Sequence, residues 1–274
     1  MIEPEITCPE CGCQWVGATV ERGIVVLECN DCSWERIEHY PFHLDAWYVT
    51  IRQALAPLDI LQSLLTDADI TEFLRPRLKG VSHLSQPLPN FRMSEAYLRG
   101  EINTANSVYL SQMIVLAVTY SELILKNFFR VLFITQPKRM NPYLAYDGKS
   151  KATIDLNELL EANSKGELIE VLAERAADKA SAQNIEKWVR QMIKECNLSL
   201  GSPLPQDLTK LREQRNVIVH EGKLNGITPE QVVWSFAQVE RLLYVIGEAA
   251  IKYGILVVDQ ARFIYETRKR LTSN

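Results

Sequence analysis

Two cysteine pairs near the N-terminus constrain the fold of this chain more than any other sequence feature. Cys8 and Cys11 form one Cys-x-x-Cys pair, and Cys29 and Cys32 form a second. Two such pairs are typical of a four-thiolate zinc site, because four thiolates complete the tetrahedron that Zn²⁺ prefers. A complete set leaves no open coordination position, so we expect structural Zn²⁺ and no cofactor for catalysis.

The segment between the two pairs is β-prone. Runs 14–20 and 24–28 flank the turn residues Glu21-Arg22-Gly23, which predicts a β-hairpin. A unit as small as residues 1–38 cannot bury enough surface to fold alone and normally needs a cross-link such as a bound metal ion. The whole unit resembles a zinc ribbon. A redox dithiol is the alternative for the paired cysteines, and Cys13 is an alternative ligand to Cys11 with poorer spacing.

What this N-terminal unit binds stays open. Trp15 and Trp34 are suited to stacking on bases, although aromatic residues in so small a unit more often cover the metal. His39 and His43 are interpreted as linker residues, because the metal set is complete without them. Cys196, like Cys13, is interpreted as a spare buried thiol.

The remainder of the chain has helical periodicity. Leu44, Trp47, Ile51 and Leu55 share one helix face, and Pro57 is expected to interrupt the run, with a second short piece ending near residue 78. A long apolar helix is expected over 94–133 with a break near Gly100, and residues 80–92 and 201–205 are expected to be loops. Further helices are predicted over 155–163, 165–179, 183–196, 206–220 (before Gly222) and from a Thr228 cap to about 253. No sheet beyond the ribbon is predicted.

The predicted organisation is mainly α: a zinc ribbon over 1–38, a helical linker region over 39–91 and a helical domain over 92–274. The net charge of −4 argues against non-specific binding of nucleic acid over the whole protein surface, so any RNA contact must come from a local basic patch. The N-terminus lacks a secretion signal, and the apolar stretch 113–133 contains too many polar residues for a free membrane span. We therefore expect a cytoplasmic protein with reduced thiols and no membrane partner.

The helix predicted over 206–220 contains an arginine and a histidine. On a helical wheel Arg212, Asn216 and His220 share one stripe, whereas Arg215 lies on a mainly apolar stripe with leucines. A cation there is costly unless it has a partner. An arginine near a histidine can hold a phosphate beside a group that titrates near neutrality. The same pair also occurs in ordinary bundles, where Arg215 would simply pair with Glu122.

Arg215-Asn216-x-x-x-His220, ending an amphipathic helix and followed by Gly222, resembles the signature of HEPN domains. Roughly residues 92–255 share the resemblance, including an earlier apolar helix that bears Glu122. The segment 137–205 is larger than a minimal HEPN bundle needs. The resemblance implies an up-and-down four-helix bundle that dimerises, with both motif helices at one cleft. Many members are metal-independent ribonucleases of toxin–antitoxin, phage-defence and RNA-processing systems.

The resemblance implies that Arg215, His220 and Asn216 are catalytic, that Glu122 orients Arg215, and that Arg212 adds a phosphate contact. Arg212 is equally well interpreted as a solvated residue that pairs with Glu213 or Asp207. Expected partners are an RNA substrate, a second copy of the chain and a separate antitoxin or regulatory protein. One alternative is a non-catalytic HEPN dimer that acts as an adaptor through its ribbon. Another is a zinc-ribbon transcription-associated factor in which the Arg–His match is accidental.

Overall fold

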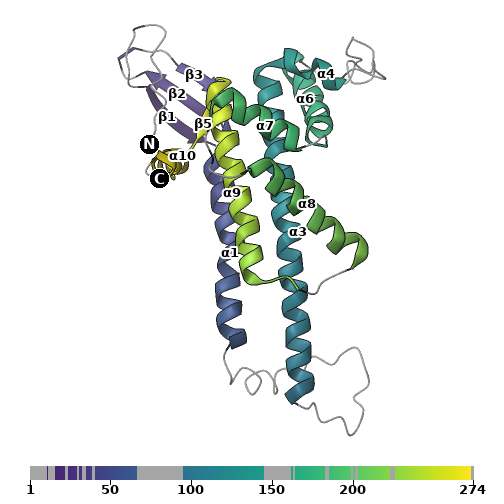
Figure 1. Cartoon of the computed structure of the whole chain (residues 1–274). Coiled ribbons are helices and arrows are strands. Elements are labelled where there is room, and N and C mark those ends of the chain that lie inside the picture. The colour runs from purple at the N-terminus through teal and green to yellow at the C-terminus, as the bar shows by residue number, and fades with distance from the viewer. Residues whose placement is uncertain are drawn as a thin grey trace.

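The computed structural model describes Cys11 and residues 16–21, 24–29, 31–32, 35–38, 41–66, 95–144, 162, 164–182, 185–198, 200, 203–222 and 226–272. It is mainly helical (Figure 1). Several predicted features lie outside these residues: Cys8, Cys13, Trp15, Trp34, His39, the piece ending near residue 78, the loop over 80–92 and the helix over 155–163.

The N-terminal unit contains a three-stranded antiparallel sheet of order β1-β2-β3. β1 (Val16–Glu21) pairs with β2 (Ile24–Cys29), with Val16 opposite Cys29 and Glu21 opposite Ile24. The predicted hairpin is therefore present. β3 (Glu35–Glu38) adds a third strand on the other side of β2, which the sequence pattern did not predict.

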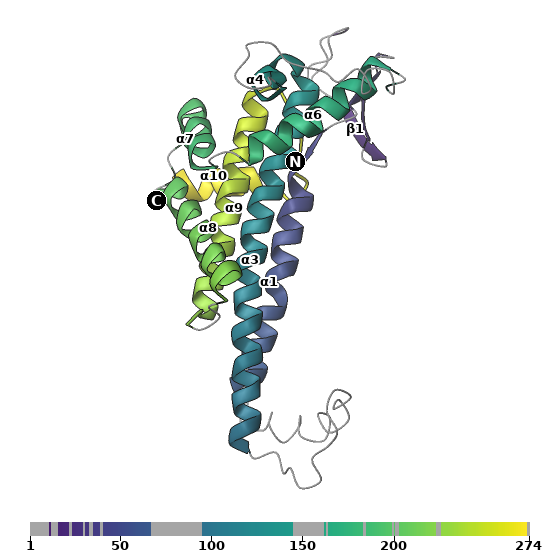
Figure 2. The ribbon, with the colours of Figure 1, turned by 90° about the vertical axis from the view of Figure 1, so that its right-hand side faces the viewer.

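Four long helices form the body of the molecule. α1 (Leu44–Thr66) runs away from the sheet, α3 (Glu95–Thr135) returns, α8 (Leu204–Glu221) runs away again and α9 (Pro229–Lys252) returns (Figures 1 and 2). α1 packs along α9 through the buried side chains of Leu44, Ile51 and Leu58, which recur every seven residues. The helix that the sequence reading placed in a linker region thus contributes to the bundle core.

The segment between α3 and α8 forms smaller elements at one end of the bundle: η1 (Pro137–Met140), α4 (Asn141–Leu144), α6 (Lys165–Ser181) and α7 (Ile185–Cys196). α6 lies against α3, and α7 lies against α8 and α9. Lys126 on α3 pairs with Glu174 at 2.7 Å and Asp178 at 2.6 Å on α6. The predicted helices over 165–179 and 183–196 are confirmed to within two residues.

Two expected helix breaks are wrong. α1 continues through Pro57, which lies inside the helix. Pro57 and Gln53 are both exposed, so water can bond the Gln53 carbonyl that the proline leaves without a donor. α3 also continues through Gly100, because a single glycine costs only about 1 kcal/mol in a long helix.

The expectation of no sheet beyond the N-terminal unit is also wrong. β4 (Phe42–His43) pairs in parallel with β5 (Val257–Val258), and the Phe42 amide donates to the Leu256 carbonyl at 2.8 Å. This short pair joins the start of α1 to the chain after α9. The chain then turns into α10 (Phe263–Thr272), a helix beyond the last one predicted.

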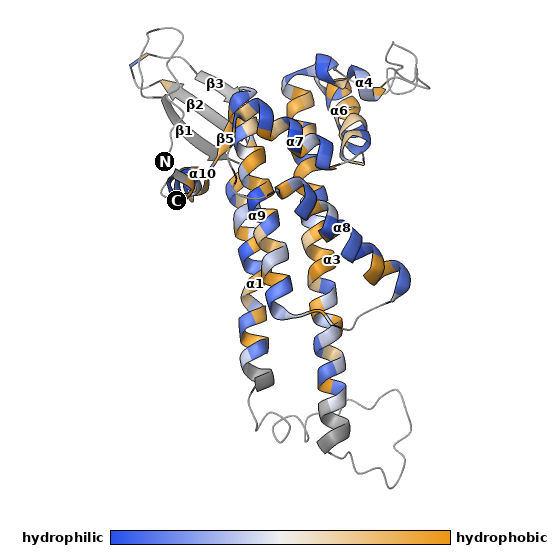
Figure 3. Ribbon diagram, viewed as in Figure 1, coloured by the Kyte–Doolittle hydropathy of each residue, from blue (hydrophilic) through white to orange (hydrophobic). Residues whose placement is uncertain are grey.

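α3 supplies much of the core. Figure 3 shows hydrophobic residues recurring along α3 and α9, whereas α8 is mostly hydrophilic. Residues 100–135 of α3 are long and apolar enough to cross a membrane by length and composition alone, and 50% of the apolar window is buried inside the bundle. The core helix of a soluble bundle meets the same criteria, so this helix does not by itself indicate a membrane span.

Candidate functional site

α8 packs against α7, α3 and α9. Leu208, Leu211 and Ile218 are among its buried residues, and Asp207 in its first turn pairs with Arg241 of α9 at 3.5 Å. The helix ends where expected, because Gly222 adopts the left-handed conformation with φ of 64°. Most of the other residues of its C-terminal half are exposed.

Arg215 occupies the position predicted from the helical wheel, half-buried beside the apolar stripe. Its Nη1 donates to the Asn216 side-chain oxygen at 3.2 Å, and its Nε is buried and has no hydrogen-bond partner among the described residues. A buried donor without a partner costs about 1–3 kcal/mol. The guanidinium presents five N–H donors in a planar fork, and its Nη end, which bonds Asn216 at the surface, is the part that a phosphate oxygen can approach.

His220 lies in the last turn of α8 and is exposed. Asn216 and Arg212 are exposed on the same stripe, about one turn and two turns before it, respectively. His220 makes no hydrogen bond to other parts of the chain that the structure describes. Its imidazole is therefore accessible from solvent and is not held as a buried structural histidine.

Glu122 does not reach Arg215 in the described part of the chain, where no ion pair joins them. Instead Glu122 and Arg212 line one small pocket between α3, α6, α7 and α8, whose empty volume of about 380 Å³ includes open solvent. Its walls are otherwise apolar and small polar residues: Val118, Ser121, Leu125, Ser181, Ile185, Leu208 and Leu211. An orienting contact between Glu122 and Arg215 stays a prediction.

A second hollow lies on the other side of α8, under its C-terminal half. Ile114 of α3, Val217 and Ile218 of α8, and Ile227 before α9 form its apolar part, with Lys210, Glu213, Gln214, Gly226 and Gln231 around them. Its empty volume is about 1050 Å³ and includes open solvent. Sequence reasoning missed this groove, because it depends on the path of the chain between α8 and α9.

The basic residues near α8 have different surroundings. Arg241 is bound to Asp207, to Gln238 at 2.7 Å and to the Leu200 carbonyl at 3.3 Å, so it holds the bundle together. Lys210 is 68% exposed and lies 3.9 Å from Asp207. Lys223 lies outside the described residues.

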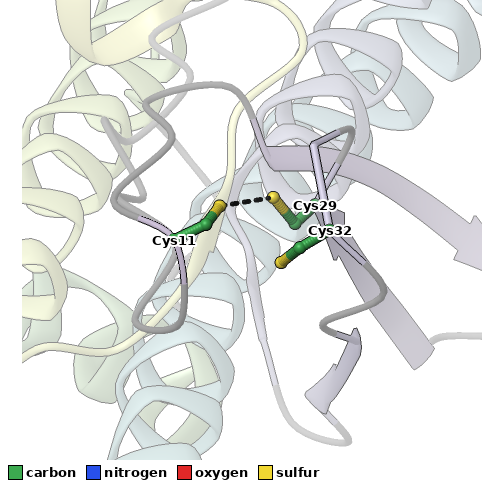
Figure 4. Close-up of side chains that lie close together, drawn as sticks. All are labelled: Cys11, Cys29 and Cys32. Carbon is green, nitrogen blue, oxygen red and sulfur yellow. Dashed lines mark hydrogen bonds between the residues drawn. The ribbon is translucent and has the colours of Figure 1, made fainter.

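Three of the four predicted metal ligands cluster. The Sγ atoms of Cys11, Cys29 and Cys32 all lie within 4.8 Å of one another, and those of Cys11 and Cys29 are 3.4 Å apart (Figure 4). Four thiolates about 2.3 Å from a tetrahedral zinc would place sulfurs about 3.8 Å apart. The described thiols therefore have a spacing that can hold a metal ion. Cys8, the fourth predicted ligand, lies outside the described residues.

The Cys29 thiol has the chemistry of a ligand. Burial raises its pKa, but hydrogen bonds from the backbone of Asp31 and Cys32 and from the Cys11 thiol outweigh this effect and lower the pKa to about 6. A thiol with this pKa is largely thiolate at neutral pH, which is the form that binds metal.

Comparison with known proteins adds no assignment. No family model, curated protein or solved structure matches the chain.

Proposed function

We propose that this protein is a metal-independent endoribonuclease of the HEPN type. The observation that carries the proposal is the state of the motif on α8. Arg215 has a buried Nε with no partner, and His220 is exposed on the same helix. A purely structural Arg–His pair would be buried with its hydrogen bonds satisfied.

The proposed reaction is a transesterification. Arg215 binds the scissile phosphate and stabilises the negative charge that develops on its oxygens. The 2′-oxygen attacks phosphorus while its proton passes to a base, and the 5′-oxygen leaves after it receives a proton from an acid. The products are a 2′,3′-cyclic phosphate and a 5′-hydroxyl. Asn216, which accepts a hydrogen bond from Arg215, fixes the guanidinium against the phosphate.

We further propose that two copies form one cleft, so that two His220 side chains divide the acid and base roles. Val219 lies within the motif, directly before His220, and is 50% exposed. An exposed apolar side chain at this position favours burial against a second α8 helix. This arrangement places the site in a homodimer, restrained by a separate antitoxin or regulatory protein in the cytoplasm.

The cysteine cluster is proposed to be a zinc ribbon that acts separately from cleavage. Cys8, Cys11, Cys29 and Cys32 would hold a structural Zn²⁺, with Cys8 completing the set. When bound, the ion would cross-link two chain segments that are too short to fold without it.

The test of the mechanism is cleavage of an RNA and of matched strands with single 2′-deoxy substitutions. The expected result is that cleavage stops at each bond whose 5′-side nucleotide lacks the 2′-hydroxyl, and that the RNA products carry cyclic phosphate ends. Cleavage of the all-DNA strand at a similar rate contradicts the mechanism.

The main alternative, a non-catalytic dimer that binds through its ribbon, predicts no cleavage of any strand. The observation that favours this alternative is the cysteine cluster, because a metal-bound N-terminal unit could bind a partner separately from α8. Deletion of residues 1–38 separates the two functions, because an enzyme built on α8 retains cleavage and an adaptor loses its partner.

A further inference from the structure

The helix α10 presents cations and an aromatic ring on one face. Tyr265, Glu266, Lys269 and Arg270 lie on α10 at spacings of three and four residues, and Arg262, with φ of 54°, directly precedes the helix; all five are exposed. The stripe carries three positive charges against one negative charge, in a chain whose net charge is −4. Such a local excess of cations is the feature that a polyanion requires.

α10 is held rigidly by its opposite face. Phe263 and Ile264 are 5% and 1% exposed, and the Phe263 ring lies 4.8 Å from that of Tyr48 on α1. Asp259 accepts hydrogen bonds from the amides of Phe263 at 2.8 Å and Ile264 at 2.9 Å. The outer face is therefore presented on a fixed support.

Arg268 belongs to this support and not to the exposed stripe. Its guanidinium makes a bidentate contact with Glu248 of α9, with both N–O distances at 2.5 Å. Glu248 is 9% exposed, so the pair joins α10 to the bundle interior and its charges cancel.

The two arginines of the stripe retain donors for a ligand. Arg270 uses its Nε on the Glu266 carbonyl and one Nη2 hydrogen on Thr267, both at 3.3 Å, which leaves three N–H groups. Arg262 forms no ion pair with the other described residues. Tyr265 is 46% exposed between these cations.

We propose that this face of α10 binds single-stranded RNA outside the cleavage site. Interleaved cations and an aromatic ring suit a flexible strand, because the cations contact phosphates and every base can stack on the ring. A membrane is a poorer partner, since the apolar residues Phe263 and Ile264 already pack inside the bundle. α10 lies on the side of α9 away from α8 (Figure 1), so it would hold RNA that flanks the cleaved bond.

This inference rests on RNA as the partner but not on cleavage. The test therefore uses a His220→Ala background and measures binding of a labelled single-stranded RNA of about 20 nucleotides by fluorescence anisotropy at several salt concentrations. The variant is Arg262→Gln/Lys269→Gln/Arg270→Gln. The control removes three exposed lysines elsewhere, Lys138→Gln/Lys179→Gln/Lys187→Gln, and so matches the change in net charge.

The α10 variant is expected to bind at least about 10-fold more weakly, and the slope of log K against log salt should fall by about 2, because each lost phosphate contact removes about 0.7. The control variant should keep both values. Tyr265→Ala should weaken binding by about 5-fold or more, whereas Tyr265→Phe should not. If the triple variant is destabilised, the double variant Arg262→Gln/Lys269→Gln takes its place, because it leaves the contacts of Arg270 intact. The double variant should show a smaller loss of RNA binding.

Equal binding by the α10 and control variants overturns the proposal. So does a loss of binding to phosphatidylserine vesicles in the α10 variant while RNA binding is unchanged, since that result assigns the face to a membrane. If the wild-type protein binds RNA normally but does not cleave it, the proposed ribonuclease activity is contradicted, whereas the proposed RNA-binding face of α10 is not.

Discussion

Arg215 is the residue at which folding and the proposed chemistry oppose each other. A leucine in its place would complete the apolar stripe of α8 with Leu208, Leu211 and Ile218, whereas the arginine leaves a buried Nε without a partner. The unpaired Nε costs stability, whereas the Nη end of the guanidinium lies at the surface, where a phosphate could bind. The sequence located this residue correctly, because the helical period alone places it on the buried side.

Gly247 lies where α9 packs closely against Leu44 of α1 and Ile264 of α10. A Cβ there would lie 2.5 Å from Leu44 Cδ1 and 2.8 Å from Ile264 Cδ1, so the ends of these two buried side chains would have to shift within the core. Gly247→Ala should therefore lower the free energy of unfolding by about 1–3 kcal/mol in urea titrations. Gly100→Ala is the matched control, with nothing within 4 Å, and should stabilise by about 0.5–1 kcal/mol. Equal effects of the two substitutions would contradict the packing described for α9.

Tyr244 gives the fold a dependence on alkaline pH. Burial, together with Glu248, raises its pKa from 10.0 to about 12. The folded state therefore keeps this proton between pH 10 and about 12 while the unfolded state loses it, so the contribution is complete below pH 10 and falls as the pH rises, by at most about 1.4 kcal/mol per unit. Thermal unfolding between pH 9 and 12 should show a shallower fall for Tyr244→Phe than for wild type. An identical pH profile would show that Tyr244 ionises normally in the folded protein.

At the scale of elements, the start of α9 sets the position of the bundle's central helix. The Thr228 side chain accepts from the Gln231 amide at 3.3 Å, and the Gln231 side chain accepts from the Thr228 amide at 3.0 Å. Thr228→Ala should cost about 1 kcal/mol, measured by urea unfolding. Thr104→Ala removes a threonine from an exposed mid-helix position and should be neutral or slightly stabilising. A loss at Thr104 as large as that at Thr228 would argue against the capping contribution.

The elements that the sequence predicted are those with local signals. The capping box at Thr228, the left-handed Gly222 and the apolar period of α3 each lie within a few residues of the structure they specify. The missed features are non-local: the β4–β5 pair joins residues more than two hundred positions apart. Pro57 and Gly100 misled the prediction, because both are exposed positions where a long helix tolerates a weak residue.

The candidate site was predictable in part for the same reason. Residues of one helix, such as Arg212, Asn216 and His220, share a face whatever the tertiary fold. The pairing of Glu122 with Arg215 required knowledge of how α3 and α8 lie together, and the structure instead places Glu122 in a small pocket with Arg212. The basic face of α10 was missed, because no helix was predicted there.

For the whole molecule, the metal site and the bundle should be separable. Purified protein should contain a single equivalent of zinc by elemental analysis, and Cys29→Ser should lose it, whereas Cys196→Ser, outside the cluster, should keep it. The helical circular dichroism of Cys29→Ser should remain, since the described helices form their own core. Protein without bound metal, or equal loss in both variants, would contradict the metal site.

The central claim is that α8 carries a ribonuclease site, and it is tested most directly by RNA cleavage in excess EDTA. Wild type, Arg215→Ala and His220→Ala should be compared after each is shown to be folded and to have the same oligomeric state. The account predicts cleavage by wild type alone, with 2′,3′-cyclic phosphate ends, and a loss of about 100-fold or more in each variant. Unchanged cleavage by either variant, or no cleavage by wild type across several classes of RNA, would contradict it.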